Sequence, residues 1–287
     1  MSRLRTFLWQ VRRELWEHRV VALAPAAVGA FAAAVHFLSA LTISDAERQG
    51  ALTDPAKADS FMQLYGAASM SVVITGLVAG ALFCLEALQG ERRDRSILFW
   101  KSLPVSDLTT VLAKIAVPVA VLPAVTLAVV VLQGMVMVPL QSLAWLMRGY
   151  DPAELWARLD LPFMWLAIAY ALPFMALWYA PIYAWFLLVS GWAKRMTILW
   201  AAAPFVAFLI VEHTALHRWM HWALEKRLAG GILEPFTRGG KGQVWLDGPA
   251  ALEPLRLYTL PGLWLGVALA ALFLFAAVRL RRSRSPI

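Results

Sequence analysis

The chain has 287 residues, of which 61% are hydrophobic and 15% are charged, and its formal net charge is +8. Soluble globular domains are about half apolar with roughly a quarter of their residues charged, so this composition indicates a membrane protein rather than a soluble one. The basic residues are spread between apolar runs and do not cluster with aromatic residues, which argues against a nucleic-acid-binding patch.

Residues 1–19 are predicted to form an amphipathic helix before the first apolar run. Apolar side chains recur along one face at helical spacing, at Leu4, Phe7, Leu8, Val11 and Leu15. Such a helix is expected to lie along the inner membrane surface, where its arginines meet anionic headgroups of membrane lipid. Two interpretations remain open: a plain flank of the first span, and a surface helix that also contacts a cytoplasmic partner.

Six apolar windows of about 20 residues predict six transmembrane helices, because that length crosses the hydrocarbon layer. Their expected bounds are residues 20–41, 64–88, 111–132, 161–189, 196–211 and 260–278. The fifth rises only about 24 Å, so we expect it to thin the bilayer, to pack inside a bundle or to continue as helix past Glu212. The fold class is therefore all-α, a polytopic membrane protein with a single transmembrane domain over residues 1–287. Kinks are expected at the prolines within the spans, which are Pro118, Pro123, Pro173, Pro181 and Pro204.

The distribution of charge predicts that both termini are cytoplasmic. Most of the 26 lysines and arginines precede the first span, follow the sixth, or fall between spans two and three or four and five, and most of the 18 acids fall elsewhere. Short basic loops face the cytoplasm. Residues 91–107 then form a cytoplasmic loop, and residues 212–258 form an outer segment with short helices.

The cytoplasmic loop reads "GERRDRSILFWKSLPVSD" from residue 90 to residue 107. Its charges from Glu91 to Arg95 would cost on the order of 10 kcal/mol at mid-bilayer, so they must lie in the cytoplasm. The apolar residues that follow suit a short helix that ends at Pro104, and Ser106 or Asp107 can cap the next helix. An aromatic anchor with an arginine rim indicates a docking surface for a protein. The alternative is that Phe99 and Trp100 belong to the interfacial aromatic belt.

Residues 90–114, "GERRDRSILFWKSLPVSDLTTVLAK", resemble the coupling-helix segment of ABC-2 type transporter permeases. That segment commonly has an acidic-basic pair, a leucine-rich turn, Pro-Val-Ser and a lysine. Residues 181–195, "PIYAWFLLVSGWAKR", resemble the end of the fourth span in a bacterial subgroup of these permeases. The six spans, the N-terminal interface helix and the long outer segment also agree with that family. Two positions depart from it: Arg95 stands where many members have glycine, and Phe99 where an acid is frequent.

The resemblance implies a permease subunit of an ATP-binding cassette exporter in the bacterial inner membrane. In that family two permease chains, here expected as a homodimer, pair with two cytoplasmic ATPase subunits that bind ATP and Mg. The residues expected to contact the ATPase are Glu91, Arg92, Arg93, Ile97, Leu98, Phe99, Trp100 and Pro104 in the loop, with Phe7 and Val11 in the N-terminal helix.

No cofactor and no enzyme activity are expected in this chain itself. It has no G-x-x-x-x-G-K-[ST] phosphate loop, and "RGGKGQ" around Lys241 lacks the first glycine and the Ser/Thr. Two other classes stay open: a non-transporting membrane sensor or scaffold, and an intramembrane enzyme, although the spans supply no clear nucleophile pair. The exported substrate is not identified by these residues.

Four polar residues within the spans draw attention because lipid penalises them. Glu86 and Lys114 lie near the cytoplasmic ends of consecutive spans, so we expect them to pair, with a substrate contact as the alternative. His36 and Gln133 lie near outer ends, where interfacial water explains them equally well.

The outer segment holds three histidines at helical spacing, His213, His217 and His221. Imidazoles one turn apart can bind a transition metal. A helix at the outer interface with Trp219 and Trp222 explains the stretch without metal, and this is the reading that we favour. The single cysteine, Cys84, lies in an apolar run, where a buried thiol is expected.

Overall fold

The computed structural model describes residues 3–42, 55–94, 96, 99, 105–153, 160–215, 219–237 and 252–283. Within these residues every regular element is helical, so the all-α prediction is confirmed. In chain order the elements are α1 (Arg3–Glu17), α2 (Arg19–Thr42), α4 (Pro55–Arg93), α6 (Asp107–Ala116), η1 (Val117–Val121), α7 (Leu122–Met147), α9 (Leu161–Trp192), α10 (Thr197–Ala215), α11 (Trp219–Leu233), η2 (Glu234–Phe236), α12 (Pro254–Tyr258) and α13 (Pro261–Ser283).

Five described helical segments are long and apolar enough to cross a membrane, so the chain is a multi-pass membrane protein. They are Arg19–Thr42, Leu64–Arg93, Asp107–Met147, Leu161–Trp192 and Pro261–Ser283. The helix at the fifth predicted span, α10, is apolar only over Thr197–Ala207 and is not among the five. It does continue past Glu212 to Ala215, which is one of the three alternatives expected for its short apolar run. A sixth crossing therefore stays a prediction.

The third span is much longer than its apolar window. Helix runs without a break from Asp107 to Met147, 41 residues, which rise about 60 Å, or twice the thickness of the hydrocarbon layer. A five-residue π-helical turn at Val117–Val121 interrupts the α-helix and contains Pro118. Because proline has no backbone N–H and its ring crowds the preceding turn, the ladder of hydrogen bonds widens there. One of the predicted kink sites thus coincides with a local change of helix type.

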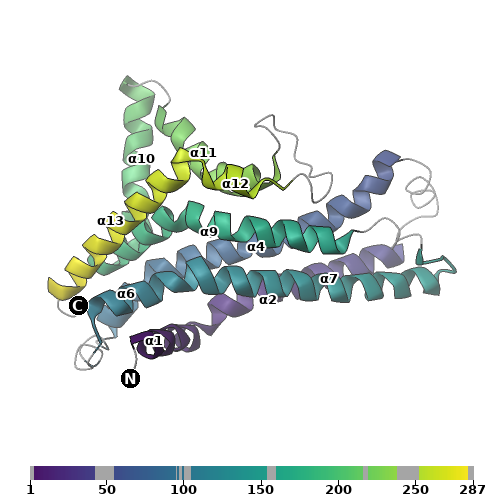
Figure 1. The fold of residues 1–287 in the computed structure, drawn as a ribbon, viewed down its shortest axis with the longest axis horizontal. Helices are drawn as coiled ribbons and strands as arrows, with labels where there is room; N and C mark the ends of the chain where they lie inside the picture. The colour runs from purple at the N-terminus through teal and green to yellow at the C-terminus, as the bar shows by residue number, and fades with distance from the viewer. Residues whose placement is uncertain are drawn as a thin grey trace.

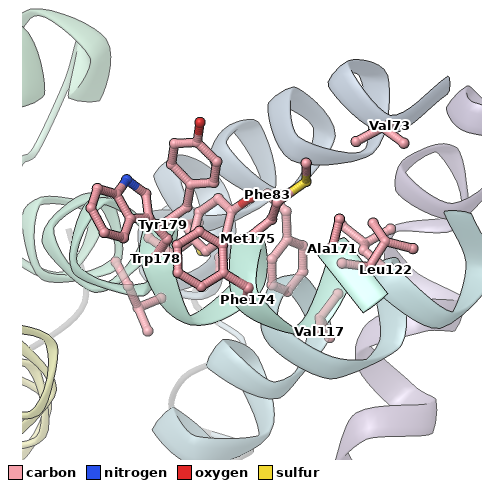
Figure 2. Packing of buried hydrophobic residues seen from close by; sticks show 14 of the residues in the cluster. Val73, Phe83, Val117, Leu122, Ala171, Phe174, Met175, Trp178 and Tyr179 are labelled. Carbon is pink, nitrogen blue, oxygen red and sulfur yellow. The ribbon is translucent and has the colours of Figure 1, made fainter. Parts of the chain in front are cut away.

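Helix α9 occupies the centre of the bundle. Half of its apolar window is buried, as is 56% of that of α4, whereas the figures for α2 and α13 are 22% and 28%. Phe174, Met175 and Trp178 on α9 pack among Phe83 of α4 and Leu122 of α7, as Figure 2 shows. Large apolar side chains on α2 and α13 are exposed instead, which suits helices that face lipid or a second chain.

Small residues allow two helix pairs to approach closely. A Cβ atom at Gly76 of α4 would lie 2.4 Å from Oγ1 of Thr126 on α7, so the crossing of these helices requires glycine. At the α9–α13 contact, Ala180 and Ala184 pack against Ala270. Lipid supplies no hydrophobic driving force between helices, so such close packing contributes much of their association.

Both ends of the described chain lie at one end of the bundle. In Figure 1 the N-terminal helix α1, the start of α6 and the last turn of α13 gather at the left of the view. Helix α1 packs against α6 rather than standing apart. Its predicted apolar face is divided: Val11 is buried, while Leu4 and Leu8 are exposed. The exposed part suits a membrane surface, but the orientation of α1 relative to lipid stays a prediction.

Candidate functional site: a buried charge cluster between α1, α4, α6 and α13

Six charged side chains meet where α1, α4, α6 and α13 converge. This charge cluster consists of Arg13 and Glu14 on α1, Glu91 in the last turn of α4, Asp107 and Lys114 on α6, and Arg281 near the end of α13. Asp107 and Lys114 are seven residues apart, so they lie on one face of α6, two turns from each other. The start of α6 is fixed by Ser106, whose hydroxyl accepts a hydrogen bond of 3.1 Å from the backbone N–H of Thr109.

Glu91 is the centre of the cluster. One carboxylate oxygen, Oε1, lies 2.9 Å from Nη2 of Arg13 and 3.1 Å from Nζ of Lys114. The other, Oε2, accepts a hydrogen bond from Nη1 of Arg281. Glu91 therefore joins α4 to three other helices through three different cations.

The remaining contacts close the network. Nζ of Lys114 donates to Oε2 of Glu14 at 2.8 Å, and Nη2 of Arg13 donates to Oε1 of Glu14 at 2.6 Å. Nε of Arg281 donates to Oδ1 of Asp107 at 2.9 Å. The guanidinium of Arg281 thus binds Glu91 before the segment 95–104 and Asp107 after it, so both ends of that segment are tied to α13.

Four of the six side chains in the cluster are buried: Glu14, Lys114, Arg281 and Glu91 are 0%, 1%, 4% and 5% exposed. Arg13 and Asp107 lie at its edge and are 15% and 23% exposed. Three cations face three carboxylates, so the charges balance, as burial requires. Charge-assisted hydrogen bonds in a medium of low dielectric constant are strong, but they offset a large desolvation cost, so such a cluster contributes defined geometry more surely than net stability.

Glu17 lies at the rim of the cluster, with Oε1 3.4 Å from Nε of Arg13. Burial raises the pKa of Glu17 above its ordinary value, and the charge of Arg13 opposes that shift. Potential metal-ligating atoms of Glu14, Glu17 and His18 lie within 4.8 Å of one another. Because Glu14 is already bound by Arg13 and Lys114, this arrangement favours ion pairing over a metal centre.

Arg92 makes a second, separate connection at the same end of the bundle. Its Nη1 donates to the backbone carbonyl oxygens of Gly191 at 2.8 Å and Ala193 at 3.4 Å, where α9 ends. These carbonyls are left without a helical partner at a helix C-terminus, and a guanidinium there also interacts favourably with the helix dipole. The last turn of α4 is therefore attached to α9 as well as to the charge cluster.

The residues predicted to contact an ATPase fall into three groups. Glu91 and Arg92 are buried inside the chain, so they do not form an exposed rim here, and in the N-terminal helix Val11 is buried and Phe7 is half-buried. Arg93 and Phe99 are exposed, and Arg93 contacts Asp94 at 3.2 Å and Glu86 at 3.4 Å. Ile97, Leu98, Trp100 and Pro104 lie outside the described residues.

The expected pairing of Glu86 with Lys114 is wrong. Lys114 points into the charge cluster and binds Glu14 and Glu91, whereas Glu86 is exposed and lies beside Arg93. The sequence showed Lys114 as a lone cation in an apolar run, but its partner on α1 is 100 residues away. No local signal in the sequence indicates that Glu14 and Arg281 belong to one charge cluster. Glu14 is a carboxylate inside the N-terminal helix, and Arg281 is one of several arginines at the end of α13.

His36 and Gln133 are buried, so interfacial water does not explain them. Among the described residues, Nδ1 of His36 and both side-chain polar atoms of Gln133 have no hydrogen-bond partner. The ring of His36 lies 5.8 Å from that of Tyr65, whose hydroxyl hydrogen-bonds Oε1 of Gln141 at 2.5 Å. A polar region therefore lies between α2, α4 and α7.

The three outer histidines do not share one helix. His213 belongs to α10 and His221 to α11, and these helices run in different directions in Figure 1. His217 lies between them, outside the described residues. The spacing that suggested converging imidazoles depended on a continuous helix, which the described chain does not form. Cys84 is fully buried, as predicted.

The charge cluster connects four helices through ion pairs and hydrogen bonds between side chains, and each of its three carboxylates is bound by at least one cation. In comparisons with known proteins, no family model, curated protein or solved structure matches this chain.

Proposed function

We propose that this chain is the membrane-spanning permease subunit of an ATP-binding cassette exporter of the ABC-2 type. A permease of this class has no motor of its own, so it needs a place where a cytoplasmic ATPase grips it and a path from that place to the spans. The segment 95–104 is the proposed grip, and the charge cluster is the proposed path. Two copies of the chain, six spans each, and both termini in the cytoplasm complete the proposed assembly.

One observation supports this proposal above the others: the charge cluster holds both ends of the segment 95–104. Arg281 binds Glu91 and Asp107 together, and Glu91 also binds Arg13 and Lys114. A scaffold that only anchors a partner has no need to connect its docking loop to four helices. A transporter does, because closure of the ATPases must reorient the spans.

Phe99 offers the most direct test of the grip. Its side chain is 59% exposed in the segment that resembles a coupling helix. Phe99→Asp is expected to release the ATP-binding subunit from complexes solubilised in mild detergent, because a carboxylate cannot fill an apolar groove. The measurement is the yield of co-purified ATP-binding subunit, and of its Mg-dependent ATP hydrolysis, per tagged permease.

Lys194→Glu is the matched control. Lys194 is also exposed and follows α9 near the same end of the bundle, but it lies outside the proposed contact residues. This variant is expected to keep the ATP-binding subunit. Equal co-purification with wild-type and Phe99→Asp chains would contradict the proposed grip, and absence of any ATP-binding partner from the wild-type chain would favour the sensor or scaffold interpretation.

A further inference from the structure

An apolar cavity lies between α9, α10, α11 and α13, away from the charge cluster. Its volume is about 430 Å³, within the usual range of sites for small ligands. Trp185 of α9, Phe205 of α10 and Phe273 of α13 line one part of it. The ring of Trp185 lies 5.4 Å from that of Phe273 and 6.5 Å from that of Phe205, so this part is aromatic on several sides.

The opposite part of the cavity holds one cation, Arg227 of α11. Its Nη1 donates to the backbone carbonyl of Gly262 at 2.9 Å, and its guanidinium lies over the ring of Trp178 at 4.7 Å. A Cβ atom at Gly266 would lie 2.0 Å from Nη2 of Arg227, so a side chain at that position would displace the guanidinium from its present place. The guanidinium of Arg227 is therefore held in place by neighbouring groups of the same chain.

Arg227 has no anionic partner among the described residues. Its Nη2 is buried and has no hydrogen-bond partner among the described residues. Within the same residues no carboxylate lies at ion-pair distance from it. Desolvation lowers the pKa of Arg227, which means that its charged form is poorly stabilised by its surroundings. A buried donor of this kind favours an anionic ligand.

The guanidinium of Arg227 and the aromatic part of the cavity lie beside successive turns of α13. Gly266 beside Arg227 and Phe273 at the aromatic part are seven residues apart, so the cavity extends about 10 Å along the helix from the cation. The shape fits an amphiphile with a negative head and an apolar chain. A soluble anion would leave the aromatic part empty, and a neutral hydrocarbon would leave Arg227 without a partner.

We propose that this cavity binds an anionic membrane lipid, with the headgroup at Arg227 and part of an acyl chain against the aromatic side chains of Trp185 and Phe273. Bound there, the lipid fills space between α10–α11 and the α9–α13 pair. The proposal does not depend on an ATPase partner or on transport, so its outcome is separate from that of the proposed function.

Native mass spectrometry of the purified full chain provides the test, with phosphatidylglycerol and phosphatidylcholine of identical acyl chains as probes. The wild-type chain is expected to bind phosphatidylglycerol more tightly. Arg227→Gln should weaken phosphatidylglycerol binding about tenfold or more, because a charge-assisted hydrogen bond is lost, and should leave phosphatidylcholine binding unchanged. Lys226→Gln, which removes an exposed charge from the same turn, should change neither.

A second variant covers the possibility that Arg227→Gln does not fold, which size-exclusion chromatography would reveal. Leu269→Trp fills the middle of the cavity, keeps Arg227, and is expected to weaken phosphatidylglycerol binding as well. The proposal is overturned if Arg227→Gln or Leu269→Trp binds phosphatidylglycerol as the wild type does, if both lipids bind wild type equally, or if glycerol phosphate without acyl chains competes as well as the lipid.

Discussion

Replacing Glu91 by alanine is expected to lower the free energy of unfolding by about 3–5 kcal/mol, because it leaves buried cations without their central carboxylate. Arg13, Lys114 and Arg281 all bind Glu91, and the side chains of Lys114 and Arg281 are 1% and 4% exposed. Loss of the carboxylate also frees α13 from α4 at the start of the segment 95–104. The measurement is thermal or denaturant unfolding of the purified chain in detergent.

Glu86→Ala is the control for Glu91→Ala. Glu86 lies on the same helix, a little more than one turn earlier, and its carboxylate is 53% exposed beside Arg93. Exposed ion pairs contribute little because water and salt screen them, so the unfolding midpoint should not move measurably. Equal midpoints for wild type and Glu91→Ala would show that the charge cluster does not hold these helices together.

The second large effect is expected at Lys114. Lys114→Met should destabilise the chain by a similar amount, about 3–5 kcal/mol, because Glu14 then remains buried with only Arg13 as its partner. The side chain of Glu14 is 0% exposed, so no rotation brings its charge to water without moving α1. The same unfolding experiment measures this loss.

The double variant Glu14→Gln with Lys114→Met distinguishes ion pairing from a loss of packing. Glu91 keeps Arg13 and Arg281 in this variant, and no carboxylate on α1 is left unpaired inside the cluster. Its destabilisation is expected to be clearly smaller than the sum of the two single changes, since removing both partners of a buried pair is often nearly neutral. Strict additivity would mean that Glu14 and Lys114 do not interact.

The apolar windows located the membrane helices because hydrophobicity over about 20 residues is a local property of the sequence. The positions of the helix ends were harder to predict from the sequence. Helix α7 continues to Met147 through Gly134 and Pro139, where packing against neighbouring helices decides the conformation, and α4 begins at Pro55, well before its window at residue 64. The short α10 was recognised as unusual for the same local reason, its limited apolar length.

The charge cluster was not predictable from the sequence alone. The cost of their charges in lipid placed Glu91 and Arg92 in the cytoplasm, and the resemblance to a coupling segment then implied that they contact an ATPase. The buried carboxylate of Glu91 is bound by Arg281, 190 residues further along, and by Arg13, 78 residues earlier, whereas Arg92 binds backbone carbonyls at the end of α9. A charged side chain in an apolar sequence needs a polar partner. Whether that partner is water, a second protein or another helix of the same chain depends on the tertiary fold.

The account depends on the segment between Glu91 and Asp107 lying on the cytoplasmic face, where a nucleotide-hydrolysing partner can reach it. Arg93→Cys allows a direct test, because the Arg93 side chain is 61% exposed and the only natural cysteine, Cys84, is fully buried. A membrane-impermeant maleimide is expected to label this variant in inside-out vesicles and not in right-side-out vesicles, and added ATP-binding subunit should reduce the labelling. Labelling of right-side-out vesicles would place the segment on the outer face and contradict the account.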